Sequence, residues 1–344
     1  MLDELGVADE LIARGLKAPV YHLRERATGA VIAFDMSELA DRTRYPFRLQ
    51  CEQYYLAMAL AERLQNHPRA EVLFSTPVVA VRQNGSEAIA TVEHKGEKRE
   101  IAAKFIIGAD GAHSVVRKCL GVEFEGFTYE EKFVSLSTDF PIEEVITDLA
   151  YVNYLSDPEE WLVLLRVPRL WRILVPGSPE ASNEELLGEE NVSKVFSRIV
   201  GDREVNVAHR TIYRVHQRVA STFVDGRIFL VGDAAHLNNP LGGFGMNSGI
   251  HDAWNLADKL EKILRRGGGP ELLDLFNRQR RAVTKSFIQA QTIENKLFME
   301  QGAADYQKQR LARFEAIAKD PEQRRAYLLR QSMFASLEEA EAIQ

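Results

Sequence analysis

Several features are scarce or missing in this chain of 344 residues. Its only two cysteines, Cys51 and Cys119, lie far apart and match no metal-binding or redox spacing, so we expect inert thiols in a reducing cytoplasm. No apolar run approaches a membrane span, because the stretch from Trp161 to Val167 is strand-sized and interrupted by Arg166. The eight histidines are scattered, and the first residues carry acids instead of a basic segment followed by an apolar core. These absences argue against a metal enzyme, a membrane protein and a signal peptide.

Basic charge is also in short supply. The 43 Lys and Arg residues are outnumbered by 50 Asp and Glu, which leaves a net charge of −7. A phosphate backbone demands clustered basic residues, so nucleic acid is not an expected partner. With 45% hydrophobic and 27% charged residues, the chain is long enough for a sizeable core and for two domains. Composition therefore favours a soluble enzyme.

The most informative stretch that is present runs from Gly226 to Asn247. Arg227 to Val231 has the composition of a parallel strand covered on both faces, and Gly232-Asp233 follows at the edge where α/β sheets bind ligands. Beyond Pro240, closely spaced glycines allow backbone N–H groups to approach a flat or anionic ligand before a helix begins near Met246. This pattern predicts a cofactor-binding loop.

A second block has a related pattern. Lys104 to Gly108 is another short apolar run, and Asp110-Gly111 after it is typical of a tight turn. Ser114 is placed to cap the following helix, with Arg117 one turn into it and positioned for a phosphate or pyrophosphate contact. Alone, such a joint is more often a plain turn than a binding site.

Together the two blocks resemble the signatures of the FAD-dependent aromatic hydroxylases of the p-hydroxybenzoate hydroxylase-like family. The family's second flavin fingerprint is matched by Gly232 to His236, Gly242 to Asn247 and Asp252 to Leu256, and its Gly-Ala-Asp-Gly-x-x-Ser-x-Val-Arg signature by the block around Asp110. One departure is Asn239, which stands where the family usually has the first proline of a pair and so bears on the stiffness of the loop.

The resemblance implies FAD as the cofactor, NADH or NADPH as the co-substrate, and hydroxylation of a small aromatic or phenol-like molecule by molecular oxygen through a flavin hydroperoxide. It implies a loop beside the reacting face of the flavin, with no side-chain nucleophile, formed by Pro240, Gly242 and Gly243. Gln53 matches a helix-start position that contacts the flavin side chain, although an exposed polar helix start is nearly as good a reading. The full implied cofactor-binding set is Gln53, Asp110, Gly111, Arg117, Gly232, Asp233, Pro240, Gly243, Gly245, Met246 and Asn247.

The family's first βαβ unit, with its Gly-x-Gly-x-x-Gly turn, has no counterpart before Met1 to Val7. The alternative is therefore a truncated, catalytically inactive fragment, and we expect strands near Lys104 to Gly108 and Arg227 to Val231 to expose unpaired edges and to promote aggregation. A halogenase of the same fold is a further alternative, but the Trp-x-Trp-x-Ile-Pro signature is missing from Leu170 to Pro176. A Gly-x-Ser-x-Gly hydrolase motif is also missing, because Ser248 comes one residue late.

The predicted fold class is mixed α/β, with a Rossmann-like FAD/NAD(P)-binding domain interleaved with a mostly antiparallel substrate-covering sheet. Mapped on the family, the FAD-binding domain comprises residues 1–17, 47–122 and 221–268, the sheet domain 18–46 and 123–220, and a helical region 269–344. The helical tail is expected to pack on the flavin domain or to support a homodimer. Helices are predicted over Asp3–Leu16 and Gln53–Gln65, and an antiparallel meander over Glu71–Ala103.

Candidate substrate-contacting groups remain open. A base for a phenol is offered by His216, His209 or Tyr213, but a lone histidine on a strand is more often structural. A substrate carboxylate would suit arginines that are equally typical of a solvated surface, namely Arg166, Arg169 and Arg172.

Overall fold

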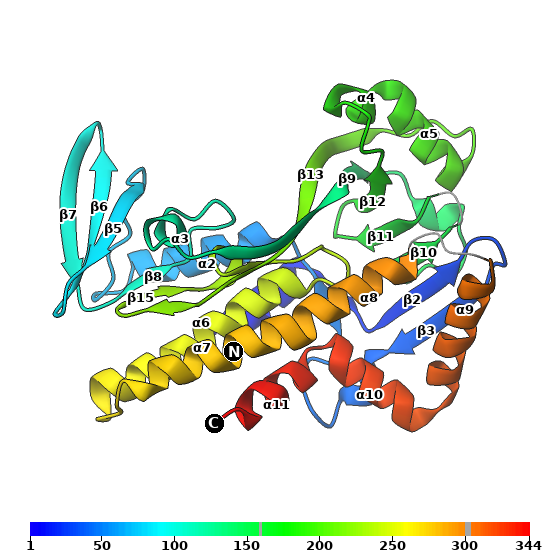
Figure 1. Ribbon diagram of the computed structural model, residues 1–344. Helices are drawn as coiled ribbons and strands as arrows, with labels where there is room; N and C mark the ends of the chain where they lie inside the picture. Colours follow the sequence, from blue (N-terminus) through cyan, green and yellow to red (C-terminus); the bar gives the residue numbers. More distant parts are fainter. Residues whose placement is uncertain (158–159, 300–303) are drawn as a thin grey trace. The chain divides into compact units, whose positions relative to one another are not determined.

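The computed structural model describes residues 1–157, 160–299 and 304–344, which form two compact units. The first unit comprises Met1–Ala70, Glu130–Arg214 and Lys296–Ser332, and the second Glu71–Tyr129, Val215–Asn295 and Met333–Gln344. Each unit mixes helices and strands, which confirms the predicted α/β class (Figure 1). The compact units group residues 1–17 and 47–70 with the large sheet, whereas the sequence assigned 1–17 and 47–122 to FAD binding. The functional assignment of the domains stays a prediction.

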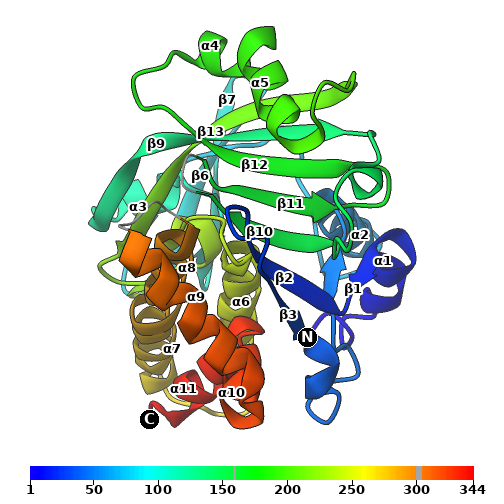
Figure 2. The same cartoon turned by 90° about the vertical axis from the view of Figure 1, so that its right-hand side faces the viewer.

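A mixed sheet is the centre of the first unit. Its strands follow the order β9, β12, β11, β10, β2, β3, and all neighbours are antiparallel except β10 and β2 (Figure 2). Their bounds are β2 Val20–Glu25, β3 Val31–Asp35, β9 Phe124–Thr138, β10 Val152–Ser156, β11 Leu162–Arg166 and β12 Trp171–Gly177. Strand β13 (Val207–Ala220) also belongs to this sheet, and like β9 it has residues in both units.

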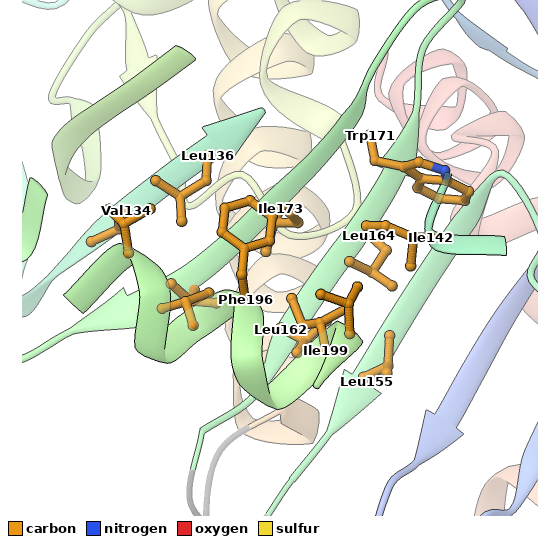
Figure 3. Close-up of a cluster of buried hydrophobic side chains, with 14 of the residues drawn as sticks. Val134, Leu136, Ile142, Leu155, Leu162, Leu164, Trp171, Ile173, Phe196 and Ile199 are labelled. Carbon is orange, nitrogen blue, oxygen red and sulfur yellow. The ribbon is translucent and has the colours of Figure 1, made fainter. Parts of the chain in front are cut away.

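The sheet buries one apolar face beneath helix α5 (Glu189–Val200). In α5 the apolar residues recur every three or four positions, which gives the helix a single apolar stripe. Phe196 and Ile199 from this stripe pack against Leu136, Leu162 and Ile173 of the strands (Figure 3). The short helix α4 (Asn183–Leu187) precedes α5.

Smaller elements complete the first unit. Strand β1 (Leu16–Ala18) pairs antiparallel with β4 (Arg48–Gln50), and helix α2 (Gln53–Gln65) matches its predicted bounds. The first helix, α1 (Ala8–Arg14), is shorter than the predicted Asp3–Leu16, because Gly6 takes a left-handed φ of 69° and Leu16 joins β1. The remaining elements are the 3-10 helices η1 Met36–Leu39 and η2 Ile142–Glu144 and the helices α9 Ala304–Lys319 and α10 Pro321–Gln331.

The second unit holds two small sheets and a pair of long helices. The predicted meander is present as β5 (Val78–Gln83), β6 (Ala88–His94) and β7 (Glu97–Ala103). A separate sheet has the order β14 (Val224–Asp225), β15 (Ile228–Leu230), β8 (Ile106–Gly108), with β15 and β8 parallel. The other elements are α3 Val115–Cys119, η3 Gly232–Ala234, β16 His236–Leu237, α6 Phe244–Arg265, α7 Glu271–Val283, the π-helix η4 Thr284–Gln289, α8 Ala290–Met299, which has residues in both units, and α11 Phe334–Ala342. Helices α6 and α7 lie side by side (Figure 1).

The expectation that two strands would be left with open edges is only half right. Strand β15 is flanked by β14 and β8, and its residues Ile228 to Leu230 are buried. In the part of the chain that the structure describes, β8 pairs with β15 alone, and its Ile107 side chain is 48% exposed. None of the helices described is both long enough and apolar enough to cross a bilayer.

Candidate active site

The turn after β15 lies directly against helix α6. Gly232 takes a left-handed φ of 57°, which a side chain would disfavour. Gly249 of α6 faces it so closely that a Cβ on Gly249 would lie 3.1 Å from the Gly232 Cα. Because both positions lack a side chain, the helix approaches the turn at backbone distance.

A buried carboxylate on α6 holds this turn in place. Asp252 of α6 is fully buried, and its Oδ2 accepts hydrogen bonds from the Gly232 backbone N–H at 3.0 Å and from His236 Nε2 at 2.8 Å. Its Oδ1 accepts from Arg280 Nε of α7 at 2.7 Å. The contact with an ionised carboxylate assigns the His236 proton to Nε2. Burial alone would raise the pKa of Asp252, but His236 and Arg280 outweigh it and hold that pKa below the ordinary value.

Sequence reasoning did not single out this network. Asp252 entered only as part of a motif match, and neither His236 nor Arg280 was proposed for a role. Their signal is a carboxylate and an arginine at buried positions on neighbouring helices, which becomes visible only when α6 and α7 are paired.

Asp233 differs from Asp252 in its exposure and in its lack of bonding partners among the described residues. Its side chain is exposed, and within the described residues its carboxylate makes no hydrogen bond or ion pair. Nearby protein atoms still desolvate it enough to raise its pKa, an effect that His236 partly offsets. The carboxylate is therefore free to accept hydrogen bonds from a ligand that carries hydroxyl groups.

The loop between β16 and α6 is shaped by glycine. Gly242 has a φ of 105°, and a Cβ there would lie 2.3 Å from the Phe244 ring and 2.6 Å from Asn295 Nδ2. Gly243, with a φ of 74°, caps α6, and its N–H donates to the Pro240 carbonyl at 3.0 Å. Helix α6 begins at Phe244, slightly before the predicted start near Met246. The N–H groups of its first turn have no partner within the helix, and they lie at the positive end of the helix dipole.

The other predicted loop residues surround this helix start. Pro240 is exposed, and Met246 is 39% exposed. Asn247 Nδ2 donates to the Gly243 carbonyl at 2.7 Å, and Gly245 lies next to the Asn238 side chain. The structure thus brings the predicted residues of this loop together at the N-terminus of α6.

Asn239 has a structural task that proline could not perform. The residue is fully buried, and its backbone N–H donates to Gln217 Oε1 at 3.1 Å. Its side chain accepts from Leu241 N at 3.1 Å and donates to the Thr292 carbonyl at 2.9 Å. Where the family uses a stiff ring, this loop is held by hydrogen bonds.

The second predicted block joins the first. Asp110 accepts from Ser114 Oγ at 2.5 Å and from Val116 N at 3.1 Å, and Ser114 Oγ accepts from Arg117 N, so the predicted cap of α3 is confirmed. Gly111 supplies the tight turn with a φ of 78°. The Arg117 guanidinium is buried, donates to the carbonyls of Ala234 and Ala112 at 2.7 Å each, and lies 3.8 Å from the centre of the Phe124 ring.

Arg117 therefore links the Asp110 turn to the Asp233 turn. Burial lowers the pKa of this guanidinium, while Asp110 acts to raise it. A direct phosphate contact by Arg117 would require one of these carbonyl bonds to be replaced, and it stays a prediction. So does the flavin contact of Gln53, which lies exposed at the first position of α2 in the first unit.

The groups considered for substrate binding have ordinary neighbours. His216 Nδ1 is 2.8 Å from Thr128 Oγ1, and Arg166 lies 3.9 Å from Glu143 and over the Trp171 ring. Burial raises the pKa of Tyr213 to about 12, which disfavours a role as a base. Among the residues described, no cluster of His, Cys, Asp or Glu is suited to hold a metal ion.

The geometry fits a planar cofactor with hydroxyl groups and a delocalised negative charge. A carboxylate without a bonding partner among the described residues, a glycine loop with left-handed backbone and a helix N-terminus meet at one end of α6. Such a combination provides acceptors for hydroxyls and donors for an anionic ring edge.

Comparison with known proteins identifies the cofactor. Residues 1–291 match the family described as FAD binding domain. The chain is 28% identical over 306 residues to the para-nitrophenol 4-monooxygenase of Pseudomonas sp. strain WBC-3, covering 87% of this chain and 75% of the relative. It is 29% identical to the 6-hydroxy-3-succinoylpyridine 3-monooxygenase of Pseudomonas putida, covering 81% and 71% respectively. The crystal structure of p-nitrophenol 4-monooxygenase from Pseudomonas putida superposes with a TM-score of 0.90 at 28% identity, over 98% of this chain and 85% of that one. The chain belongs to this family of FAD-dependent aromatic hydroxylases and is an FAD-dependent monooxygenase.

Proposed function

We propose that the enzyme uses NADH or NADPH and molecular oxygen to hydroxylate a small phenol-like molecule, with bound FAD supplying the oxygen chemistry as a flavin hydroperoxide. The observation that carries the proposal is the unbonded Asp233 carboxylate beside the N-terminus of α6. The two relatives named above support it, since their names describe a nitrophenol and a hydroxypyridine as substrates.

The chain's own groups would position the cofactor. Asp233 would accept hydrogen bonds from the ribityl hydroxyls, and the N–H groups of the first turn of α6 would stabilise negative charge on the flavin. Pro240, Gly242 and Gly243 would keep the reacting face free of side chains. Asp110 and Gly111 would make further contacts, and Arg117 would hold the two turns in register through Ala234 and Ala112.

The decisive experiment is a titration of the purified protein with FAD, followed by the quenching of flavin fluorescence. Loss of a charge-assisted contact costs about 1.5–3 kcal/mol, so Asp233→Ala should weaken FAD binding roughly 10- to 100-fold. Asp258→Asn is the matched control, because Asp258 is an exposed carboxylate on helix α6 that is paired with Lys262. Failure of the native protein to bind FAD, or equal affinity of Asp233→Ala, would contradict the proposal.

Turnover is tested separately with a panel of phenols. NADH- or NADPH-dependent oxygen consumption with a product one oxygen atom heavier supports the hydroxylase. Firm FAD binding without any turnover supports the alternative of a catalytically inactive flavoprotein.

A further inference from the structure

The first unit contains a partly buried positive charge without an acidic partner. The guanidinium of Arg48 on β4 donates from Nη1 to the Tyr154 hydroxyl at 3.1 Å, and its Cζ lies 4.4 Å from the centre of the Tyr21 ring. In the described ranges no carboxylate pairs with Arg48, whereas Arg198 and Arg324 of the same unit have Glu160 and Glu38. Taking a charge out of water without a counter-ion is costly unless a ligand supplies one.

A second polar group, the hydroxyl of Tyr21, lies in the same cluster as Arg48. Tyr21 on β2 is 1% exposed, and its hydroxyl makes no hydrogen bond of normal geometry, although the Tyr327 hydroxyl lies near it. Burial, followed by the proximity of Tyr327, raises the pKa of Tyr21, so its hydroxyl stays protonated and able to donate. Buried hydroxyls in folded proteins are nearly always satisfied, and each exception calls for an explanation.

Strand pairing places these groups on one face. Strands β2 and β10 are parallel with Leu23 opposite Tyr154, so Tyr21, two residues before Leu23, projects to the same side as Tyr154. Strand β4 carries Arg48 to this side, where the Tyr21 ring stacks on Phe34 at a centroid distance of 5.4 Å. The cluster therefore combines a guanidinium and hydroxyl donors with flat aromatic surfaces.

We propose that Arg48, Tyr21 and Tyr154 form a binding subsite for one anionic oxygen of an aromatic ligand, a phenolate or carboxylate oxygen. The inference rests on the proposed function, because it makes this ligand the substrate. The oxyanion accepts hydrogen bonds from Arg48 and Tyr21, which neutralises the unpaired charge and satisfies the buried hydroxyl. The neighbouring rings favour an aromatic ligand over a small inorganic anion. The enzyme accordingly selects ionised over neutral aromatic compounds.

The test compares ionised aromatic probes with uncharged twins by isothermal titration calorimetry, with and without FAD. The pairs are 4-nitrophenol with 4-nitroanisole, and 4-hydroxybenzoate with its methyl ester, at a pH that ionises the acids. The native protein should bind at least one ionised probe roughly 10-fold more tightly than its twin, the low end of the range for a charged hydrogen bond.

The variants separate charge recognition from folding. Arg48→Gln should abolish the preference for the ionised probe and leave the affinity for its twin unchanged, and Arg48→Lys should restore part of it. Tyr21→Phe should reduce the preference about 3- to 10-fold. Arg69→Gln is the control, since Arg69 is an exposed arginine of the same unit. Melting curves followed by circular dichroism verify that each variant is folded.

Three results would overturn the subsite: no preference for any ionised probe in the native protein, equal weakening of both twins in Arg48→Gln, or complete competition by chloride or inorganic phosphate. These outcomes are distinct from failure of the proposed function. Hydroxylation can persist while Arg48→Gln keeps the charge preference, which sinks only the subsite. Conversely, the native protein can prefer ionised probes and yet bind no FAD, which sinks only the proposed function.

Discussion

At the scale of single residues, the contrast between Asp252 and Asp233 organises the site. Asp252 is buried and bound to Gly232, His236 and Arg280, so its carboxylate oxygens are already engaged by protein donors. Asp233 lies on the adjoining turn and has no partner among the residues described. One carboxylate fixes the position of the turn, and this leaves the other available for a ligand.

Breaking the buried ion pair of Asp252 and Arg280 should strongly lower the free energy of unfolding. Removal of one partner of a buried ion pair costs about 3–5 kcal/mol, so we expect Asp252→Asn and Arg280→Met each to lower the free energy of unfolding in urea by about that amount. The double variant should cost clearly less than the sum. Asp258→Asn, on the exposed face of α6, should change stability by less than about 0.5 kcal/mol. Additive effects of the two buried changes would show that the residues act independently.

Histidine His251 should make stability depend on pH. Burial, then the neighbouring Arg280, lowers its pKa to about 4 from an ordinary 6.5. The folded state binds the His251 proton less readily than the unfolded state does. The contribution of neutral His251 to the free energy of unfolding is therefore complete above pH 6.5 and is lost as the pH falls towards 4. The loss is at most about 3 kcal/mol. In urea melts at several pH values, the free energy of unfolding of His251→Gln should decline less between pH 6.5 and 4 than that of the native protein. An equal decline in both proteins would show that His251 is not the group responsible.

At the scale of elements, the start of α6 depends on two adjacent glycines with different surroundings. Both Gly242 and Gly243 have positive φ, but a Cβ on Gly242 would meet Phe244 and Asn295, whereas nothing lies within 4 Å of one on Gly243. Asn239 anchors the same loop through its hydrogen bonds to Gln217 and Thr292. Hydrogen bonds of Asn239 therefore fix one part of the loop. The path of the other part requires glycines, because Gly242 and Gly243 have positive φ.

This difference predicts unequal effects of one methyl group. Gly243→Ala should cost about 1–2 kcal/mol from the left-handed backbone alone. Gly242→Ala should cost about 1–3 kcal/mol more because of overpacking, and it should also weaken FAD binding by displacing the Phe244 ring. Urea melts and FAD titrations of the two variants provide the comparison. Equal losses at the two positions would mean that crowding at Gly242 is relieved by local movement.

At the scale of the whole molecule, the open edge of β8 is a liability. Its partner β15 is protected on both sides, but within the described residues β8 has a partner strand on one side only, and it carries the exposed Ile107. Exposed apolar edge strands are templates for intermolecular pairing. Association through this edge would couple concentration to the loss of soluble protein.

A charge on that edge should therefore improve solubility. We expect Ile107→Lys to raise the fraction of soluble monomer seen by size-exclusion chromatography with light scattering, since edge lysines oppose strand pairing. Met58→Lys is the control, because Met58 is 62% exposed but lies on helix α2 and not on a strand edge. Equal gains from both changes would point to general surface hydrophobicity as the cause.

The success of sequence reasoning followed the range of the interactions involved. The bounds of α2, the antiparallel pairing of the meander and the cap of α3 by Ser114 depend on neighbours along the chain, and these predictions are confirmed. Partners from distant segments were not predictable. Arg280 meets Asp252 across 28 residues, Arg117 reaches Ala234 across 117, and Arg48 contacts Tyr154 across 106. No local pattern in the sequence around Arg48 points to its tyrosines.

The bond between the Arg117 guanidinium and the Ala234 carbonyl makes two distant stretches of sequence depend on each other. In a chimera that takes only residues 104–122 from a relative lacking this arginine, the turn that carries Asp233 would lose its hydrogen bond from Arg117. Recombination between such hydroxylases should thus succeed when both stretches come from the same parent.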